Sequence, residues 1–200
     1  MKLNEVLEIA ADQKRARILD GALKLALSYG YSRATMDDIA RAADMSRPAL
    51  YLLFRNKTEI YREIARTVMR RSIEAARAEI GKEGDFAQRL GSAIDAAIFS
   101  SLCQFAKSPH GGELLDMKTS LAGDLIENWC RELSDLFAGA ICAEAAANGV
   151  DLKAAGLCPR GMANMLMDGL EGMKTRLADV EAQKKAACGL VRVIALALRA

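Results

Sequence analysis

Apolar residues recur along this chain with the period of an α-helix, and no segment alternates apolar and polar residues for long. Ile18, Ala22, Leu25, Ala26 and Tyr29 form one such face, and similar spacing continues toward the C-terminus. A period of 3.6 residues places these side chains on one side of a helix, whereas a half-buried strand needs a period of two. The sequence therefore predicts an all-α protein of about nine helices.

Three helix-start signals follow the first predicted helix, which is expected to stop at Gly30. Each places a hydroxyl or amide side chain where it can accept hydrogen bonds from free backbone N–H groups. The segment from Met1 to Gln13 is expected either to extend the first helix or to form a loose arm. The signals are Thr35 with Asp38, Ser46, and Asn56 with Glu59.

Longer helices are predicted beyond these short ones, separated by stretches that contain Gly or Pro. The helix that starts near Lys57 is expected to join two modules. The first is a three-helix domain over residues 1–60, and the second is a helical domain over residues 61–200. The longer helices are expected at about 57–80, 86–107, 120–148, 160–177 and 180–199.

Charge is distributed unevenly, although the whole chain carries a formal charge of only +2. Residues 1–71 contain 14 Lys and Arg against 9 Asp and Glu, a balance of +5, which leaves −3 for residues 72–200. A basic end favours a polyanionic partner. No run approaches the roughly 18–20 apolar residues needed to cross a bilayer, and no apolar signal segment follows Met1. We therefore expect a globular cytoplasmic protein that does not associate with a membrane.

The stretch after Thr35 has the residues that a helix-turn-helix needs. Two closely crossing helices require small residues at the crossing, an apolar residue in the turn and apolar residues inside the second helix. Asp44 stands at the turn position that favours glycine, and Asp is one of the few other residues that tolerate positive φ. A plain helical hairpin is the alternative on packing alone. The packing residues are Ala40, Ala43, Met45, Leu50 and Phe54.

From Thr35 to Lys57 the sequence reads TMDDIARAADMSRPALYLLFRNK, with Gly30 ahead of it. This stretch resembles the N-terminal signature of the TetR family of regulators: Thr, four intervening residues, Ala, a turn, Ser, and then Leu-Tyr-x-x-Phe-x-Asn-Lys. The resemblance covers about a quarter of the chain. It implies an N-terminal helix-turn-helix that binds double-stranded DNA, followed by a divergent C-terminal helical domain that binds a ligand and forms a homodimer.

Residues 46–53 are predicted to be the recognition helix, whose N-terminal end enters the major groove. Arg47 can donate to both acceptors of a guanine, while Pro48 and Ala49 can pack on a thymine methyl. The other candidates are expected to contact the phosphate backbone. Leu53 stands where the family often has His or Tyr, so its contact with DNA stays open. The candidate DNA-binding residues are Thr35, Ser46, Arg47, Pro48, Ala49, Tyr51 and Lys57.

The C-terminal helices carry apolar stripes that could form either a core or a ligand pocket. Flexible thioethers and large aromatic rings accommodate varied apolar ligands. The candidate pocket residues are Phe99, Phe105, Trp129 and Met165.

The last two predicted helices also have apolar faces, which a monomer would bury internally. The resemblance implies instead that the two helices of each subunit form a four-helix dimer interface. The candidate interface residues are Met162, Leu166, Leu170, Met173, Val191, Ile194 and Leu198.

The five cysteines, an odd number without a C-x-x-C spacing, argue against a disulfide framework and a structural zinc site. We interpret them as mainly buried thiols, and cysteine-based redox sensing is the alternative. His110 is the single histidine, and the sequence contains neither an H-E-x-x-H motif nor a second histidine for a metal, so neither an enzyme nor a cofactor or metal is expected. A helical enzyme or interaction module with a vestigial helix-turn-helix is a further alternative. The cysteines are Cys103, Cys130, Cys142, Cys158 and Cys188.

The sequence thus predicts a ligand-responsive transcription regulator. The resemblance implies a repressor that leaves a palindromic operator when a small apolar or amphipathic molecule binds the C-terminal domain. Neither the effector nor the operator sequence follows from these residues.

Overall fold

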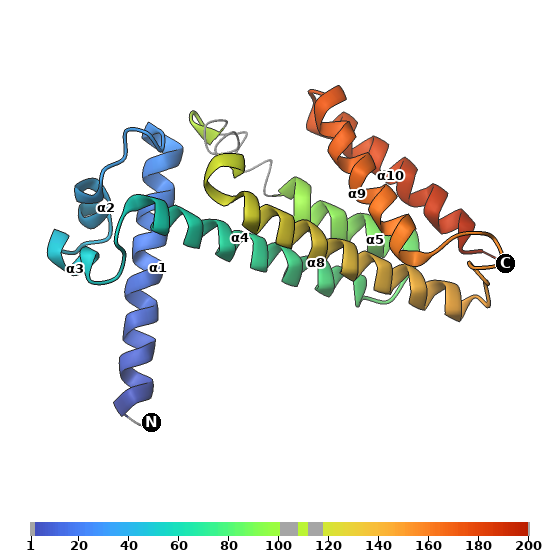
Figure 1. Ribbon diagram of the computed structural model, residues 1–200, viewed down its shortest axis with the longest axis horizontal. Coiled ribbons are helices and arrows are strands. Elements are labelled where there is room, and N and C mark those ends of the chain that lie inside the picture. The colour runs from blue at the N-terminus through green and yellow to red at the C-terminus, as the bar shows by residue number, and fades with distance from the viewer. Residues whose placement is uncertain (1–2, 101–107, 112–117, 200) are drawn as a thin grey trace. The chain divides into compact units, whose positions relative to one another are not determined.

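A computed structural model of the chain describes residues 3–100, 108–111 and 118–199. Every regular element in these ranges is a helix, which confirms the all-α prediction (Figure 1). The elements are α1 (Leu3–Tyr29), α2 (Met36–Ala42), α3 (Arg47–Tyr51), α4 (Lys57–Ile80), α5 (Phe86–Ile94), η1 (Asp95–Phe99), α8 (Lys118–Ala147), α9 (Pro159–Arg176) and α10 (Val180–Ala197).

The predicted helix starts are confirmed. Thr35 Oγ1 accepts a hydrogen bond from the Asp38 N–H, and the Thr35 N–H donates to the Asp38 carboxylate, which completes a capping box. Ser46 Oγ accepts from the N–H of Ala49 at 3.4 Å and starts α3. Asn56 Oδ1 accepts from the N–H of Glu59 at 2.9 Å and starts α4. These caps satisfy donors that the helices cannot satisfy internally.

Helix α1 ends where the sequence predicts, but one residue of its predicted face is wrong. Gly30 has a φ of 89°, a left-handed conformation that favours glycine at a helix end. Ile18, Ala22 and Ala26 are completely buried. Tyr29 is 63% exposed, and Tyr31, beyond the end of the helix, is buried instead. The helical period stops at Gly30, so it cannot place the residue that follows the turn.

The chain divides into two compact units, each with its own hydrophobic cluster. The first comprises Met1–Val68 and Gln104–Ile126, and the second comprises Met69–Cys103 and Glu127–Ala200. The division falls inside α4 and α8, so each unit combines separate segments of the chain. The predicted domain boundary after Ile60 remains a prediction.

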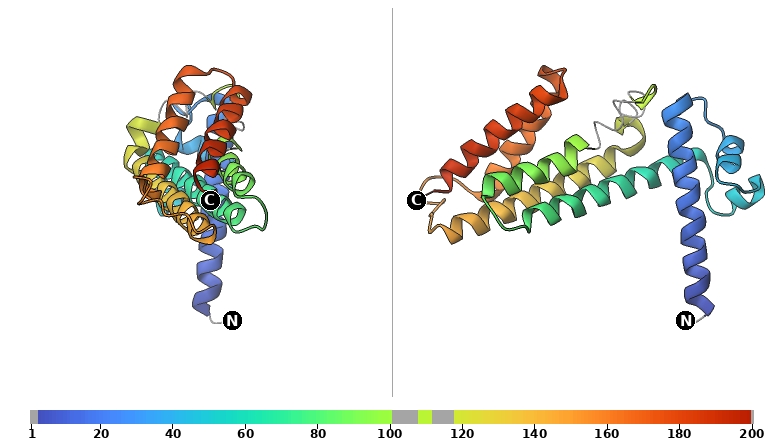
Figure 2. Two further views of the ribbon diagram at one scale, coloured as in Figure 1. Left: turned by 90° about the vertical axis from the view of Figure 1, so that its right-hand side faces the viewer. Right: turned by 180° about the vertical axis from the view of Figure 1, so that it is seen from behind.

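Within the second unit, α9 and α10 lie side by side in all the views (Figures 1 and 2). The predicted continuous α-helix over 86–107 changes character, because Asp95–Phe99 forms a π-helical turn in which the Ser100 N–H donates to the Asp95 carbonyl. Residues 101–107 lie outside the described residues. Helix α8 agrees with the helix predicted at 120–148, except that Ala122 departs from helical geometry (φ −142°, ψ 24°).

Candidate nucleic-acid interface

The turn between α2 and α3 has the geometry of a helix-turn-helix. Asp44 adopts a φ of 54° and is the non-glycine residue with positive φ among the described residues. The next N–H, that of Met45, donates to the carbonyl of Ala40 at 3.0 Å. Leu50 and Phe54, both at most 2% exposed, anchor α3 and the residues after it in the first cluster. The predicted turn at Asp44 and the predicted packing of Leu50 and Phe54 are therefore confirmed.

Helix α3 turns its predicted contact residues outward. The side chains of Ser46, Arg47 and Pro48 are exposed, and Tyr51 is 42% exposed. Leu53 packs against the first cluster. Its neighbour Leu52, which the sequence did not single out, is 86% exposed. Neighbouring side chains point in different directions, so Leu53 faces the first cluster while Leu52 faces outward.

The Arg47 side chain contacts the Asp37 carboxylate and the Tyr51 ring. Its Nη1 donates to Oδ2 of Asp37 at 3.3 Å, and its Nε lies 3.1 Å from Oδ1. The guanidinium carbon lies 5.5 Å from the centroid of the Tyr51 ring. Hydrogen bonding to Tyr51, followed by the charge of Asp37, raises the pKa of Arg47 above its ordinary value. The side chain is 60% exposed, so Asp37 holds it at the surface, where a base edge could compete for it.

Thr35 is engaged in its own helix start. Its hydroxyl donates to Oδ2 of Asp38 at 2.6 Å. The hydroxyl and then the backbone N–H of Thr35 lower the pKa of Asp38, and Arg41 adds an ion pair at 2.6 Å. A phosphate would have to compete with Asp38 for this hydroxyl proton.

Lys57 is turned toward the loop between α1 and α2. Its Nζ donates to the backbone carbonyls of Tyr31, Ser32 and Ala34 at 3.2, 3.3 and 3.2 Å. The same atom lies 4.5 Å from the centroid of the Tyr31 ring. The predicted phosphate contact would require Lys57 to release these carbonyls.

An ion pair joins α4 and α8 inside the first unit. Arg62 Nη1 and Nη2 donate to the two oxygens of Asp124 at 2.9 and 2.7 Å. Hydrogen bonding from Arg62 lowers the pKa of Asp124, and Asp124 raises that of Arg62. This two-bond geometry fixes orientation as well as distance. The sequence did not indicate it, because its partners are far apart in the chain.

The seven residues predicted to form a dimer interface are buried within the single chain, and their place in a dimer contact remains a prediction. They belong to the core of the second unit and are at most 7% exposed, so they can add little area to a contact with another chain. The apolar period reports a buried face but does not say which partner buries it. The seven residues are Met162, Leu166, Leu170, Met173, Val191, Ile194 and Leu198.

The three predicted pocket residues that the structure describes differ in burial. Phe99 is 3% exposed within the core, whereas Met165 is 65% exposed on α9. Trp129 is half-buried, and its Nε1 donates to Ser72 Oγ at 2.8 Å. Phe105 lies outside the described residues.

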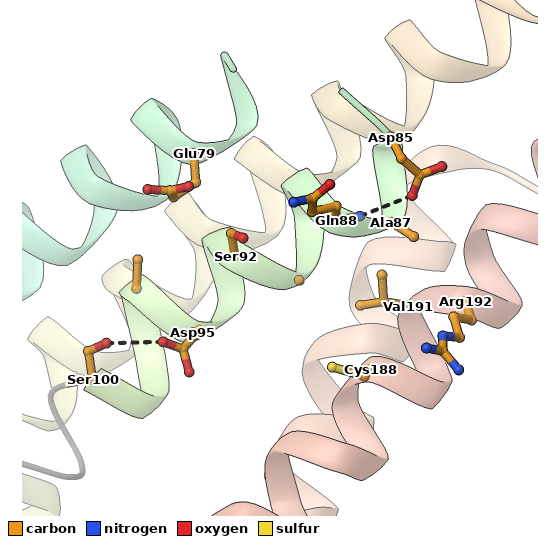
Figure 3. Close-up of a pocket in the computed structure, with 12 residues that line it drawn as sticks. Glu79, Asp85, Ala87, Gln88, Ser92, Asp95, Ser100, Cys188, Val191 and Arg192 are labelled. Carbon is orange, nitrogen blue, oxygen red and sulfur yellow. Dashed lines mark hydrogen bonds between the residues drawn. The ribbon is translucent and has the colours of Figure 1, made fainter. Parts of the chain in front are cut away.

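A different pocket lies in the second unit, between α5 with η1 and the facing side of α10 (Figure 3). Its volume is about 650 Å³. Small side chains such as Ala96 and Ser92 line one wall, and Cys188, Val191 and Arg192 line the other. Lys184 beside it pairs with Asp95 at 2.7 Å. The lining therefore combines small apolar, polar and charged residues, unlike the three aromatic residues and one methionine predicted from sequence.

Three thiols are exposed, which corrects the expectation of mainly buried cysteines. Cys142, Cys158 and Cys188 are exposed and Cys130 is half-buried, while Cys103 lies outside the described residues. In the described part of the chain, no cluster of three metal-binding side chains occurs. Nor is any helix found there that is long and apolar enough to cross a membrane.

Comparison with known proteins agrees with this geometry. Residues 18–64, which contain α2, α3 and their turn, match the model of the tetR family of bacterial regulatory proteins. The chain is 32% identical over 85 residues to the HTH-type transcriptional activator FasR of Mycolicibacterium smegmatis. This match covers 42% of the chain and 39% of FasR, so the chain spans well under two thirds of that relative.

Solved structures extend the likeness in fold to nearly the whole chain. The structure of SmeT, the repressor of the Stenotrophomonas maltophilia multidrug efflux pump SmeDEF, has a TM-score of 0.64 at 20% identity. The match covers 90% of this chain and 88% of SmeT. The reduced form of E. coli NemR has a TM-score of 0.66 at 16% identity, covering 90% and 97%. The family match therefore covers the helix-turn-helix segment of residues 18–64, and the solved structures show that nearly the whole chain shares their fold.

Proposed function

We propose that the protein is a homodimeric transcription regulator that binds a palindromic operator through α3 and leaves it when a small molecule binds the second unit. The observation that carries the proposal is the outward face of α3, where Arg47 and Tyr51 stand beside a turn closed by Asp44. A recognition helix of this kind reads base edges with residues at its N-terminal end. Repression is the proposed sign of regulation, as SmeT is named a repressor, whereas FasR is named an activator.

The outer faces of α9 and α10 are the proposed dimer contact. Three large apolar side chains stand exposed on these helices: Met165, Val193 and Leu196, at 65%, 63% and 62%. Gly172 and Gly189 have open space where a side chain would begin, so a second pair of helices could approach closely. Exposed apolar residues on adjacent helices favour a subunit contact, and a symmetric dimer buries each of them twice.

The pocket between α5 and α10 is the proposed effector site. Gly91 lies on its wall, and no neighbouring atom comes within 4 Å of the position that a Cβ would take there. Gly91→Trp should therefore fill the opening without disturbing the core. We expect this variant to bind the amphipathic dye 1-anilinonaphthalene-8-sulfonate more weakly than the native chain does. Gly139→Trp on α8, which also has open space, is the control. Equal dye binding by both variants would remove the pocket from the proposal.

Redox sensing is the second candidate function. The exposure of Cys142, Cys158 and Cys188 favours it, since accessible thiols react with oxidants. A solved structure of the same fold is described as a reduced form. This candidate predicts that oxidant changes operator affinity and that a Cys→Ser variant abolishes the change. An unaltered oxidant response in every single Cys→Ser variant would exclude it.

Operator selection tests the main proposal. Purified protein is mixed with genomic fragments that include its own promoter, and the bound DNA is sequenced. Arg47→Ala should then weaken binding to the selected site about 5- to 150-fold and relax its sequence preference. Arg70→Ala, which removes an arginine of similar exposure that pairs with Glu74 on α4, is the control. Binding without any sequence preference would refute the proposal.

A further inference from the structure

The loop between α1 and α2 rests on the first two turns of α4. Tyr31 is the centre of this contact, and its hydroxyl lies 3.3 Å from Thr58 Oγ1. The rings of Tyr31 and Tyr61 meet edge to face, with centroids 4.7 Å apart and an interplanar angle of 73°. Tyr61 in turn donates its hydroxyl to the carbonyl of Ala22 at 2.9 Å. Both rings are buried, so α1, the loop and the start of α4 pack against one another.

Lys57 closes this contact electrostatically. An ammonium group has three N–H donors, and the Lys57 ammonium has three carbonyl partners in the loop, those of Tyr31, Ser32 and Ala34. The Tyr31 ring adds a cation–π contact. Ala34 directly precedes Thr35, the N-cap of α2. The ammonium therefore holds the backbone immediately before the helix-turn-helix.

We propose that Lys57 is a positioning residue for operator binding, which holds the Tyr31–Ala34 loop on α4 and does not itself contact DNA. Fixing the loop fixes the start of α2, and α2 carries Asp37, which holds Arg47 at the surface. Loss of the clamp would let α2 and Arg47 adopt many orientations, only some of which fit a groove. The inference rests on the proposed DNA-binding function.

Two substitutions separate a clamp from a phosphate contact. Lys57→Gln removes the charge and one of the three donors. Lys57→Arg keeps the charge but presents a planar fork, which suits a phosphate and does not match three diverging carbonyls. The clamp therefore predicts that arginine fails to rescue, whereas a phosphate contact predicts that arginine succeeds. Arg70→Gln is the control for loss of one positive charge.

The measurement is operator affinity as a function of salt concentration, on full-length variants shown to be folded by circular dichroism. We expect Lys57→Gln and Lys57→Arg both to bind about tenfold more weakly, as for loss of a charge-assisted hydrogen bond. The slope of log affinity against log salt should stay at the native value. A slope reduced by about 1 in Lys57→Gln, with native affinity in Lys57→Arg, would overturn the proposal, because that is the signature of one lost phosphate contact.

Hydrogen exchange without DNA provides a readout that does not depend on operator binding. We expect the amides of residues 31–36 to exchange faster in both Lys57 variants and at the native rate in Arg70→Gln. Native exchange in all three variants would overturn the clamp. If the native chain itself selects no operator, the proposed function fails, and the exchange comparison still decides whether Lys57 holds the loop.

Discussion

The two units differ in how their sequences relate to their contacts. In the first unit, the side chains of Thr35, Ser46 and Asn56 accept hydrogen bonds from specific backbone N–H groups at the starts of helices. In the second, α9 and α10 pack mainly through apolar side chains around a shared core. A polar contact identifies its partner by geometry, whereas an apolar face can be buried against any apolar surface. These helix-start contacts of the first unit are therefore easier to predict from sequence than the packing of α9 and α10.

The largest expected effect concerns the apolar surface of the second unit, where substitutions should abolish the proposed dimer. Changing both Val193 and Leu196 to Asp should weaken dimerisation at least about 1,000-fold, since each buried Val or Leu contributes about 1.5–3 kcal/mol and occurs twice in a symmetric dimer. Sedimentation equilibrium measures the change. Lys153→Asp, in the loop before α9, is the control for added negative charge. A native dimer in the double variant would move the subunit contact elsewhere.

The next effect concerns the core of the second unit. Phe137 is completely buried there, and Phe137→Ala should lower the free energy of unfolding by about 3–5 kcal/mol because it leaves a cavity. Denaturant unfolding measures this loss, and Leu136→Ala at the half-buried neighbouring position should cost less. Native-state hydrogen exchange should show unchanged protection in α2 and α3. Equal loss of protection there would contradict the separation into two cores.

A smaller effect tests the restraint on Arg47. Asp37→Asn removes a carboxylate that competes with DNA for the guanidinium, so operator affinity should rise about two- to fivefold, the size of an exposed ion pair. Fluorescence anisotropy with labelled operator measures the change. Asp44→Asn removes an equal charge and keeps a residue that tolerates positive φ, which makes it the matched control. An equal rise in both variants would mean that charge alone matters.

The smallest effect is a titration. Arg62 lowers the pKa of Asp124, so the ionised carboxylate favours the folded chain above its ordinary pKa, and this contribution is lost as pH falls through the lowered value. Arg62→Met should return the pKa of Asp124 toward its ordinary value, as measured by carboxyl NMR. Arg66→Met, which breaks a pair with Glu63, should leave Asp124 unchanged. An unchanged pKa in Arg62→Met would contradict the assigned cause.

Sequence reasoning succeeded where the interaction is local. The Thr35 capping box spans three residues, and the positive φ of Asp44 depends on one turn, so both were predictable from residue type. The all-helical fold followed from periodicity for the same reason. These features need no knowledge of distant segments.

Sequence reasoning failed where a contact depends on the tertiary fold. Arg47 meets Asp37 only after the turn folds α3 back toward α2, and Lys57 meets the Tyr31–Ala34 loop only when α4 returns to α1. Leu166 is buried and its neighbour Met165 is exposed because of the side of α9 that faces the core. Residue type alone does not identify the buried position, since both residues are apolar.

The Arg62–Asp124 pair has a consequence for anyone who cuts this chain into pieces. A fragment that ends at Val68 would keep α1, α2, α3 and the beginning of α4, and so would look like a complete DNA-binding domain. It would nevertheless leave Arg62 without its carboxylate partner, because that partner is encoded in α8. A fragment that keeps this ion pair therefore needs a discontinuous design, in which the segment that carries Asp124 is grafted back onto it.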